Sequence, residues 1–564
     1  MARTKRSKYT NAVLDFETDP FKFGRVPKPF AAEFHCDLKT EVFWGDNCVE
    51  RLMEFLEAEE TPYRIYAHNG GKFDFHFMHK YLDNPLKVIN SRIVHATLGK
   101  HVVRDSLAII PVPLKRFFKS AKGEIDYRRL ERHLREKHKT EILEYLHQDC
   151  TSLYATVSAF DERFGPKLTV GSTAMEQLIQ LHDFEIMSPE QDAIFRPFYF
   201  GGRVECFKSG ILEGPYIGID VNSSYPKSMR DFKHPLSAAF HEREKMPDNF
   251  DIPFFVEFDG TNQGALPIID DTGGLVFDKT SGRFRACSHE LKVAFEYGLA
   301  TVDKVHKVYI AQQWGSFGDF VDKFYAEKVA AKMTGDELTE MFSKFMLNSC
   351  YGKFGTNPDN FQDWYINRDF GNDLTLEANG YTLECEYDDF ELWARPSEIN
   401  KSAYFNVSIA ASITSASRSI LLDGLQRSVN PVYCDTDSII CKGFNGEISD
   451  SVLGAWKLER TAPSVAIAGK KLYAMYDPET LALPKTVYNK EFQAQDPNPA
   501  RKAMKLSSKG GQLSVDDIIA ICKGQTVRYE NMAPSFSIHK DTKFIARNFK
   551  MTAHDTIDEI AEFS

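Results

Sequence analysis

The sequence predicts a multidomain protein that combines α/β and α+β architecture. The chain has 564 residues and is 43% apolar, which is more than one hydrophobic core accommodates, so we expect several domains. Residues 11–110 alternate short β-like runs, such as AVLDFET and YRIYAHN, with helical stretches, a pattern typical of a mixed α/β domain. The segment FRPFYFGGRVECF (195–207), rich in Pro, Phe and Gly, predicts a boundary beyond which a second region begins.

Helical periodicity defines the next elements. Apolar residues recur at i, i+3 and i+4 in EILEYLHQDCTSLYATVSAF, so residues 126–163 are expected to be helical. Two further helices are expected at 318–332 and 336–350, where Gly335 can end the first and Asp336 can cap the second. The run PVYCDTDSIIC (431–441) is apolar and rich in β-formers, which predicts a strand.

Composition limits the partners and the compartment. The formal charge is −11, from 69 Lys and Arg against 80 Asp and Glu, which weighs against a polyphosphate partner. Basic residues nevertheless cluster in LKRFFKSAKG (114–123) and YRRLERHLREKHK (127–139). The ten cysteines lack metal-ligand spacing and are expected to be reduced thiols. No apolar run has the length of a signal peptide or a membrane span, so we expect a soluble, intracellular protein with no membrane partner.

Four acids in the first third form a candidate metal site. Asp15 and Glu17 share one face of a strand, Asp74 lies among phenylalanines, and Asp149 follows Tyr145 by four residues on one helix face. Taken singly, each pattern is more often a solvated face. Together they could hold two hard cations through oxygen, activating a water to hydrolyse a phosphodiester, with the Tyr145 hydroxyl orienting that water.

A second acidic group lies in the predicted strand 431–441. Tyr433, Asp435 and Asp437 alternate along it and would share one face. Burying their charge costs several kcal/mol unless a cation meets it. Asp220, at the end of the apolar strand in YIGIDV, and the backbone carbonyl of Val221 could complete a site for two Mg²⁺ ions, leaving room for a triphosphate.

A triphosphate also requires cationic ligands. Lys344, Asn348 and Tyr351 form one helical stripe, and Lys332 can approach the same phosphates. Tyr225 could lie beneath the sugar and leave no space for a 2′-hydroxyl. The alternative is a solvated helix face for the lysines and a core position for the tyrosine. The acidic strands favour the functional interpretation.

The first group of motifs resembles the DEDD-type 3′–5′ proofreading exonucleases of the tyrosine-bearing subclass. This resemblance implies an RNase H-like fold with a catalytic tyrosine, Tyr145, and a catalytic lysine, Lys122 in AKGEIDY. It implies that the acids already named bind metal and carry out catalysis. It also implies contacts with single-stranded DNA from His68, Asn69, Phe77, Ser106, Leu107 and Tyr127.

The second group resembles the family-B DNA polymerases. DVNSSYP is similar to motif A, KFMLNSCYG to motif B and YCDTDS to motif C. By this resemblance Asp220, Val221 and Asp437 ligate two Mg²⁺ ions, with Mn²⁺ as a substitute, and Asp435 supports them. It implies nucleotide binding by Ser223, Tyr225, Lys332, Lys344, Asn348 and Tyr351. It implies DNA binding by Tyr199, Gly201 and Gly202 in YFGG, by Lys471 and Tyr473 in KLY, and by Lys509.

Several stretches narrow the resemblance to the protein-primed branch, in its tectivirus type, with similarity also to the Bacillus podovirus enzymes. They are YAHNGGKFDF, FRPFYFGG, NSCYGKFG and AIAGKKLYA. The resemblance implies a replicative polymerase of a linear phage genome, with proofreading and strand displacement, in the cytoplasm of a bacterial host. Its partners would be primer-template DNA, dNTPs, a terminal-protein primer and, as a further candidate, a single-stranded DNA-binding protein.

The same resemblance implies a division of the chain. We expect an exonuclease domain at 1–185 and a right-hand polymerase at 186–564. The polymerase would comprise a palm (about 190–245 and 403–485), a first insertion (246–317), fingers (318–356), a second insertion (357–402) and a thumb (486–564).

Two other interpretations are possible at this point. A non-catalytic scaffold that docks a terminal protein could keep the fold, but it would be free to lose carboxylates, and all seven named acids are present. A stand-alone nuclease leaves residues 199–564 unexplained. The chain departs from the family at Ser224, where a large apolar residue is usual, so we expect a weaker buttress for the Tyr225 ring.

Overall fold

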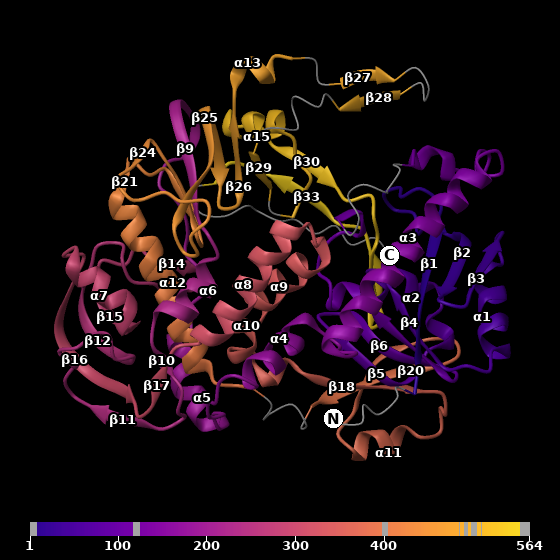
Figure 1. The fold of residues 1–564 in the computed structure, drawn as a ribbon, viewed down its shortest axis with the longest axis horizontal. Helices are drawn as coiled ribbons and strands as arrows, with labels where there is room; N and C mark the ends of the chain where they lie inside the picture. Colours follow the sequence, from indigo (N-terminus) through magenta and orange to yellow (C-terminus); the bar gives the residue numbers. More distant parts are fainter. Residues whose placement is uncertain are drawn as a thin grey trace.

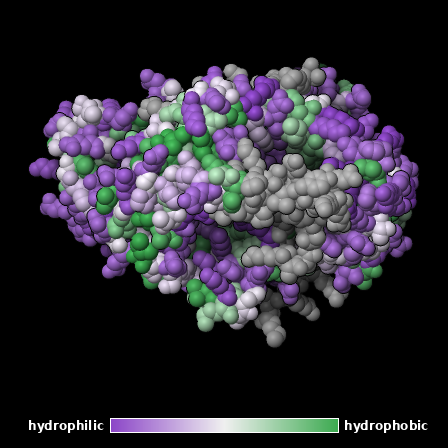
Figure 2. Space-filling view, turned by 90° about the horizontal axis from the view of Figure 1, so that it is seen from above, coloured by the Kyte–Doolittle hydropathy of each residue, from purple (hydrophilic) through white to green (hydrophobic). Residues whose placement is uncertain are grey.

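The computed structural model describes residues 8–116, 125–397, 404–483, 486–489, 494–497, 505–508 and 510–552. Three sheets organise these residues, with helices packed between and around them (Figure 1). No helix in the described part of the chain is long and apolar enough to cross a membrane. Hydrophilic side chains predominate on the face in Figure 2, and hydrophobic ones form separate patches.

A ten-stranded sheet occupies the N-terminal side, in the order β19-β20-β18-β5-β6-β7-β4-β1-β2-β3. Its middle strands are mostly buried, because they have a paired strand on each side and packed side chains above and below. Seven strands come from the first 105 residues and three from the second predicted insertion. They are β1 Thr10–Thr18, β2 Pro29–Cys36, β3 Lys39–Trp44, β4 Tyr63–Ala67, β5 Asp83–Ile89, β6 Arg92–Leu98, β7 His101–Asp105, β18 Gln362–Asn367, β19 Thr382–Glu386 and β20 Glu391–Pro396.

The segment 357–402 therefore extends the N-terminal sheet. β18 joins β5 where Trp364 pairs with Leu86, and the Asn84 side chain exchanges two hydrogen bonds with the Ile366 backbone, at 2.7 and 2.9 Å. Helix α11 (Asp373–Ala378) connects β18 to β19. Figure 1 shows these elements beside β5 and β6 although some 270 residues separate them in sequence.

Helices α1 (Cys48–Ala58) and α3 (Lys139–Phe164) pack against the strands of this sheet. The expectation of a helix from residue 126 is wrong for its first turns. Residues 127–130 form a 3₁₀ turn capped by Asp126, and the α-helix begins at Lys139. The intervening segment is held by side chains instead of a helical ladder, since Arg135 pairs with Asp46 at 2.7 Å.

A four-stranded sheet and helix α7 (Ser288–Glu296) form a separate unit in the first predicted insertion. Its strands are antiparallel, in the order β11-β16-β12-β15, and its core includes Phe254, Val256, Phe258 and Phe284. The strands are β11 Phe240–Arg243, β12 Phe254–Asn262, β15 Ser281–Cys287 and β16 Ala300–Ala311. Figure 1 shows this unit at the end of the molecule opposite β1–β3.

A seven-stranded sheet, ordered β29-β26-β25-β9-β23-β22-β8, carries Asp220, Asp435 and Tyr473 of motif A, motif C and the KLY segment. β9 lies at its centre, between β23 and β25, which brings Asp220 beside segments more than 200 residues away. The strands are β8 Val204–Cys206, β9 Gly210–Val221, β22 Tyr433–Asp435, β23 Ser438–Cys441, β25 Trp456–Gly469, β26 Leu472–Tyr476 and β29 Lys505–Ser508.

Helices fill the space between the sheets. The expected break between α8 (Gly318–Thr334) and α9 (Glu337–Ser349) is confirmed: Gly335 has φ 74°, and the Asp336 side chain accepts from Thr339 N at 3.0 Å. α12 (Val407–Arg427) is buried over most of its length. The remaining helices include α2 Asp74–Phe77, α4 Val170–Ile179, α5 Pro189–Phe195, α6 Ser224–Asp231, α10 Tyr351–Phe354, α13 Pro478–Leu481 and α15 Val515–Cys522.

The C-terminal residues return to the N-terminal sheet. The hairpin of β31 (Ser535–Ser537) and β32 (Lys540–Lys543) places Phe536 on the His76 ring, with centroids 5.1 Å apart, and edge-on to Phe77 at 5.8 Å. Another pair, β30 (Val527–Glu530) and β33 (Ala546–Phe549), packs near α15. The first and last described segments are therefore in direct contact.

Candidate active sites

The four predicted acids of the first third converge on one face of the ten-stranded sheet. Asp15 and Glu17 lie on β1, Asp74 begins α2 and Asp149 lies on α3, which crosses β1 and β2. Asp74, Asp149 and Glu17 are 2%, 6% and 7% exposed. Because α3 packs directly on β1, the side chains of Asp15 and Glu17 on the strand and of Asp149 on the helix lie in the same buried space.

Their electrostatics are those of an uncompensated anionic cluster. Burial, together with the charges of Asp74, Asp149 and Glu17, raises the pKa of Asp15 well above its ordinary value. Burial raises the pKa of Asp74 to about 7, with Asp105 adding to the shift. One Asp74 oxygen, Oδ1, is buried without a hydrogen-bond partner among the described residues. A carboxylate in this state requires a proton or a cation.

Tyr145 lies one helical turn before Asp149, as predicted. Burial raises the pKa of the Tyr145 hydroxyl, and the charge of Asp149 and a hydrogen bond with Tyr127 add to the rise, so it stays protonated. Tyr127 is 62% exposed and available to a ligand at the mouth of the cluster. Lys122 lies outside the described residues.

The residues predicted to contact single-stranded DNA include a hydrogen-bonded group around His68. His68 bridges Ser106 Oγ at 3.0 Å and the Val112 carbonyl at 2.9 Å. Ser106 is fully buried and donates to the Ala67 carbonyl, so in this structure it holds His68 in place and presents no surface to a strand. Leu107 is partly exposed, and its N–H donates to Asp105.

Asn69 and Phe77 complete the group. Asn69 has a left-handed backbone, φ 66°, and its Oδ1 accepts from Arg92 at 2.9 Å. Phe77 packs edge-on to Phe16 of β1, with centroids 5.9 Å apart, and to Phe536 of the C-terminal hairpin.

The second acidic group lies on a hairpin, which corrects the expectation of one continuous strand over 431–441. β22 ends at Asp435, β23 begins at Ser438, and Thr436 turns the chain with φ 57°. Asp435 therefore ends β22, and Asp437 is the second residue of the Thr436–Asp437 turn, so the two acids do not alternate along one strand face. The single Thr-Asp step carries a turn without Gly or Asn, so the sequence lacked the usual hairpin signal.

The turn brings Asp437 to Asp220. Val221 N donates to the Asp437 carbonyl at 2.8 Å, and Ser438 pairs with Asp220 across the sheet. Burial raises the pKa of Asp437 to about 7, and the charges of Asp220 and Asp435 add to the shift. Burial also raises the pKa of Asp220, opposed by Lys457. The structure therefore brings the three acids Asp220, Asp435 and Asp437 together.

Lys471 neutralises the third acid. Its Nζ lies 2.7 and 2.8 Å from the two oxygens of Asp435, and its own N–H donates to the Tyr433 hydroxyl at 2.9 Å. Its backbone has φ 57°. Tyr473 is 5% exposed and packs against Tyr433, with centroids 4.7 Å apart. The KLY motif is thus held against motif C by the contacts of Lys471 and Tyr473 with Asp435 and Tyr433.

The YFGG segment lies against the same hairpin. A Cβ on Gly202 would approach Thr436 to 2.7 Å, which explains the glycine, and Thr436 N donates to the Arg203 carbonyl at 2.7 Å. The Gly201 carbonyl accepts from Arg418 Nη1 at 3.0 Å. Tyr199 approaches Gly355 so closely that a Cβ there would lie 2.6 Å from its ring. Arg418 was missed by the sequence analysis, because a lone arginine on an apolar helix carries no pattern.

The predicted nucleotide-contact residues lie on α6 and on α8–α10. Tyr225 stacks on Tyr351 with centroids 3.9 Å apart and planes at 16°, and Asp437 is close enough to raise the pKa of both hydroxyls further. Ser223 has φ 63° at the start of α6. Ser224, the departure from the family, is 1% exposed and bonds Ser417 Oγ at 3.0 Å.

The predicted lysines form one cationic group. Burial lowers the pKa of Lys328, and the positive charges of Lys344 and Lys332 lower it further. Asn348 donates to the Lys344 carbonyl at 2.9 Å. Lys328, one turn before Lys332, was not predicted, although its i, i+4 spacing could have indicated it.

Lys457 was also missed. It pairs across the sheet with Asp220, its Nζ 3.4 Å from Oδ1, and it approaches Glu459 at 3.7 Å. Glu459 in turn pairs with Lys505. The signal is the alternation in WKLE, which puts Lys457 and Glu459 on one face of a strand. Lys509 lies outside the described residues.

Both clusters have the donor set of a divalent-cation site. They offer carboxylate oxygens, which hard cations prefer, and their acids are buried and raise one another's pKa. The orphaned Asp74 oxygen is unsatisfied by the protein alone. The residues therefore fit bound divalent metal ions.

The comparisons agree with this geometry. Residues 117–438 match the family model "DNA polymerase type B, organellar and viral". The DNA-directed DNA polymerase of Enterobacteria phage PRD1 is 41% identical over 97% of this chain and 99% of its own length. The DNA polymerase of Bacillus phage phi29 is 26% identical over 66% of this chain and 67% of its own.

The fold is similar to that of solved phi29 DNA polymerase structures. One, complexed with primer-template DNA and incoming nucleotide substrates, superposes with a TM-score of 0.66, covering 96% of this chain and all of that one, at 18% identity. The architecture expected from the motifs is thereby confirmed. A full-length relative, a matching family model and two carboxylate clusters in place leave one conclusion: the chain belongs to the organellar and viral type-B DNA polymerases and is a DNA-directed DNA polymerase.

Proposed function

We propose that this polymerase copies a linear genome from a terminal-protein primer and proofreads its product in a second, separate active site. The observation that carries the two-site part of this proposal is the presence of two independent carboxylate clusters. Asp15, Glu17, Asp74 and Asp149 belong to the ten-stranded sheet, and Asp220, Asp435 and Asp437 to the seven-stranded sheet. Two sites on two sheets allow synthesis and hydrolysis to be performed by one chain.

In the polymerase site, Asp220 and Asp437 would hold two Mg²⁺ ions, with Mn²⁺ as a substitute. Bound ions would supply a lower pKa for the attacking hydroxyl and stabilisation of the leaving phosphates. Lys471 keeps Asp435 paired and presents its ammonium at the primer end. Lys332, Lys344 and the neighbouring Lys328 would offset the triphosphate charge. The stacked Tyr225 and Tyr351 rings form a wall for the sugar.

In the exonuclease site, the four acids would hold two further ions. The protonated Tyr145 hydroxyl would orient the attacking water by a hydrogen bond. His68, held by Ser106 and Val112, together with Asn69, Phe77, Leu107 and Tyr127, would position the single strand at the mouth of the cluster.

The proposed domain division is the one that the resemblance implies, with the exonuclease at 1–185 and the polymerase at 186–564. The separate four-stranded unit supports a distinct first insertion, which would dock the terminal protein. The second insertion, joined to the N-terminal sheet, would support strand displacement. Primer-template DNA, dNTPs, the terminal protein and a single-stranded DNA-binding protein are the proposed partners, in the cytoplasm of a bacterial host.

Protein priming is tested by incubating the purified chain with the candidate terminal protein, one labelled dNTP at a time, and Mg²⁺ or Mn²⁺. We expect a covalent protein–nucleotide adduct with one dNTP, lost in Asp437→Asn. Extension of a DNA primer is measured in parallel. Active extension with no adduct for any dNTP would reject protein priming and leave the polymerase assignment intact.

A further inference from the structure

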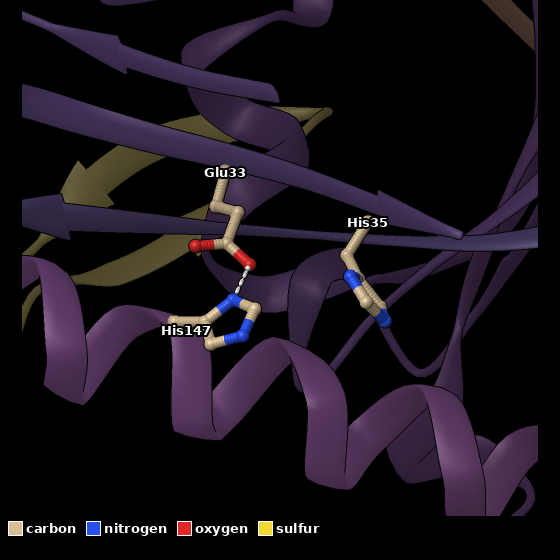
Figure 3. A group of neighbouring side chains, drawn as sticks. All are labelled: Glu33, His35 and His147. Carbon is tan, nitrogen blue, oxygen red and sulfur yellow. Dashed lines mark hydrogen bonds and ion pairs between the residues drawn. The ribbon is translucent and has the colours of Figure 1, made fainter. Parts of the chain in front are cut away.

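A third group of ligand-type side chains lies on the ten-stranded sheet beside the exonuclease cluster. Glu33 and His35 project from β2, and His147 projects toward them from α3 (Figure 3). One ligand atom from each lies within 4.8 Å of the others, and His147 Nδ1 is 2.9 Å from Glu33 Oε1. Two imidazoles and one carboxylate therefore face a common point between a strand and a helix.

The carboxylate of this group is buried and half-satisfied. Glu33 is 1% exposed, and its second oxygen, Oε2, has no hydrogen-bond partner among the described residues. His147 meets only Oε1. A buried carboxylate oxygen left unpaired is costly, and a cation bound to the carboxylate removes that cost.

One histidine of the group is held in place and the other is open to solvent. His35 is oriented by its surroundings, because its Nδ1 lies 2.7 Å from Thr40 Oγ1 and its ring packs edge-on to Tyr154 at 5.3 Å. Fixing one ring nitrogen through a hydrogen bond directs the other to a ligand. The His147 side chain is 50% exposed, which gives an ion a route from solvent.

We propose that Glu33, His35 and His147 form a binding site for a Zn²⁺-type transition-metal ion. Imidazole nitrogens favour such ions over Mg²⁺, which prefers oxygen ligands. A tetrahedral ion with bonds of about 2.1 Å separates its ligand atoms by about 3.4 Å, so a shift of the exposed His147 side chain toward the other two ligands closes the site. Water fills the remaining position on the exposed side.

The ion would join the strand and the helix that frame the exonuclease cluster. Glu33 lies directly opposite Asp15 in the β1–β2 register, and His147 precedes Asp149 by two residues on α3. Binding would therefore fix α3 to β2 without using any of the four exonuclease acids. The inference concerns metal binding itself and holds whether or not the exonuclease assignment does.

The test uses the full chain stripped of metal and titrated with Co²⁺, whose visible absorption reports nitrogen ligands, in the presence of excess Mg²⁺. We expect one Co²⁺ per chain displaced by Zn²⁺, and a Zn²⁺-dependent rise in the unfolding temperature. Both signals should persist in Asp15→Ala with Glu17→Ala, which lacks two exonuclease acids.

Two substitutions should abolish the Co²⁺ signal: His147→Gln, at the exposed position where folding is not at stake, and Glu33→Gln. Thr40→Val should weaken binding by about 10–100-fold, because it removes the hydrogen bond that orients His35. His133→Ala, an exposed histidine of the preceding segment, is the matched control and should bind as the parent does. Absence of Co²⁺ absorption in the parent, or equal absorption in His147→Gln, would overturn the proposal.

Discussion

Arg418 and Glu290 form a bidentate ion pair in which both side chains are 2% exposed, with N–O distances of 2.8 and 3.0 Å. Glu290 belongs to α7 beside the four-stranded sheet, and Arg418 belongs to α12. Arg418 Nη1 donates to the backbone carbonyls of Phe200 and Gly201. One guanidinium thus connects helix α7 of the four-stranded unit to the YFGG segment.

This pair predicts a large loss of stability when one partner is removed. Glu290→Gln should destabilise the chain by about 3–5 kcal/mol, because Arg418 would be left buried and uncompensated. Denaturant unfolding measures the loss. The matched control is Asp423→Asn, which breaks the exposed Arg427 pair on the same helix and should cost at most about 0.5 kcal/mol. Equal losses in the two variants would contradict the role of burial.

The two active sites should be separable by substitution. Asp15→Ala with Glu17→Ala should abolish 3′–5′ degradation of single strands, since these side chains belong to the ten-stranded sheet alone. Primer extension should survive, because Asp220 and Asp437 are unchanged on another sheet. Both activities are measured on one labelled primer, with and without dNTPs. Loss of extension in a folded double variant would refute the two-site arrangement.

Asp437 should matter more than Asp435 for synthesis. Asp437 shares its burial and repulsion with Asp220, whereas Lys471 already compensates Asp435. Asp437→Asn and Asp220→Asn should lower incorporation by orders of magnitude, at about 1.4 kcal/mol for each tenfold, and Asp435→Asn should lower it less. Single-turnover incorporation provides the comparison. A larger loss in Asp435→Asn than in Asp437→Asn would show that the metal ligands are assigned incorrectly.

Tyr225→Val should raise ribonucleotide incorporation relative to deoxynucleotide incorporation. The ring that stacks on Tyr351 would be gone, and the space beneath the sugar would open. Incorporation efficiencies for dNTP and rNTP on one primed template give the ratio. Tyr351→Phe keeps a ring at the stack and serves as the control. An unchanged ratio in Tyr225→Val would make Tyr225 a packing residue.

Metal removal should make the stability of the chain depend on pH. The folded-state pKa of Asp74 is raised from 3.8 to about 7, so its contribution to stability is fully present below about pH 4 and is lost as the pH rises through 7. Chelator-treated protein should therefore unfold at a lower temperature at pH 8 than at pH 5.5. Mg²⁺ should restore it at pH 8.

Asp74→Asn supplies the control for that experiment. It removes the titrating group, so the difference in the free energy of unfolding between pH 5.5 and pH 8 should shrink, by a few kcal/mol at most. Asp437, whose pKa is also raised to about 7, keeps part of the dependence in that variant. A pH response unchanged by the substitution would show that the Asp74 carboxyl does not titrate as described.

The sequence predicted the paired acids of β1 and the boundary between α8 and α9, because both depend on local rules. Strand alternation placed Asp15 with Glu17, and Gly335 with Asp336 marked a helix boundary. The details that depend on how distant strands pair were not predictable. The Asp435–Asp437 turn follows from pairing with β8 and β9, and Lys457 gains its meaning only when β25 lies beside β9.

The addition of β18 to the edge of β5 has a consequence for anyone who dissects this polymerase. A fragment ending at residue 185 would keep β5 but lose the strand that covers it, exposing Leu86, which is 1% accessible in the intact chain. It would also lose Phe536 from the surface of His76 and Phe77. An uncovered edge strand with apolar neighbours is a template for aggregation. The proposed exonuclease activity is therefore best studied by inactivating the polymerase site in the whole chain and not in a separate fragment.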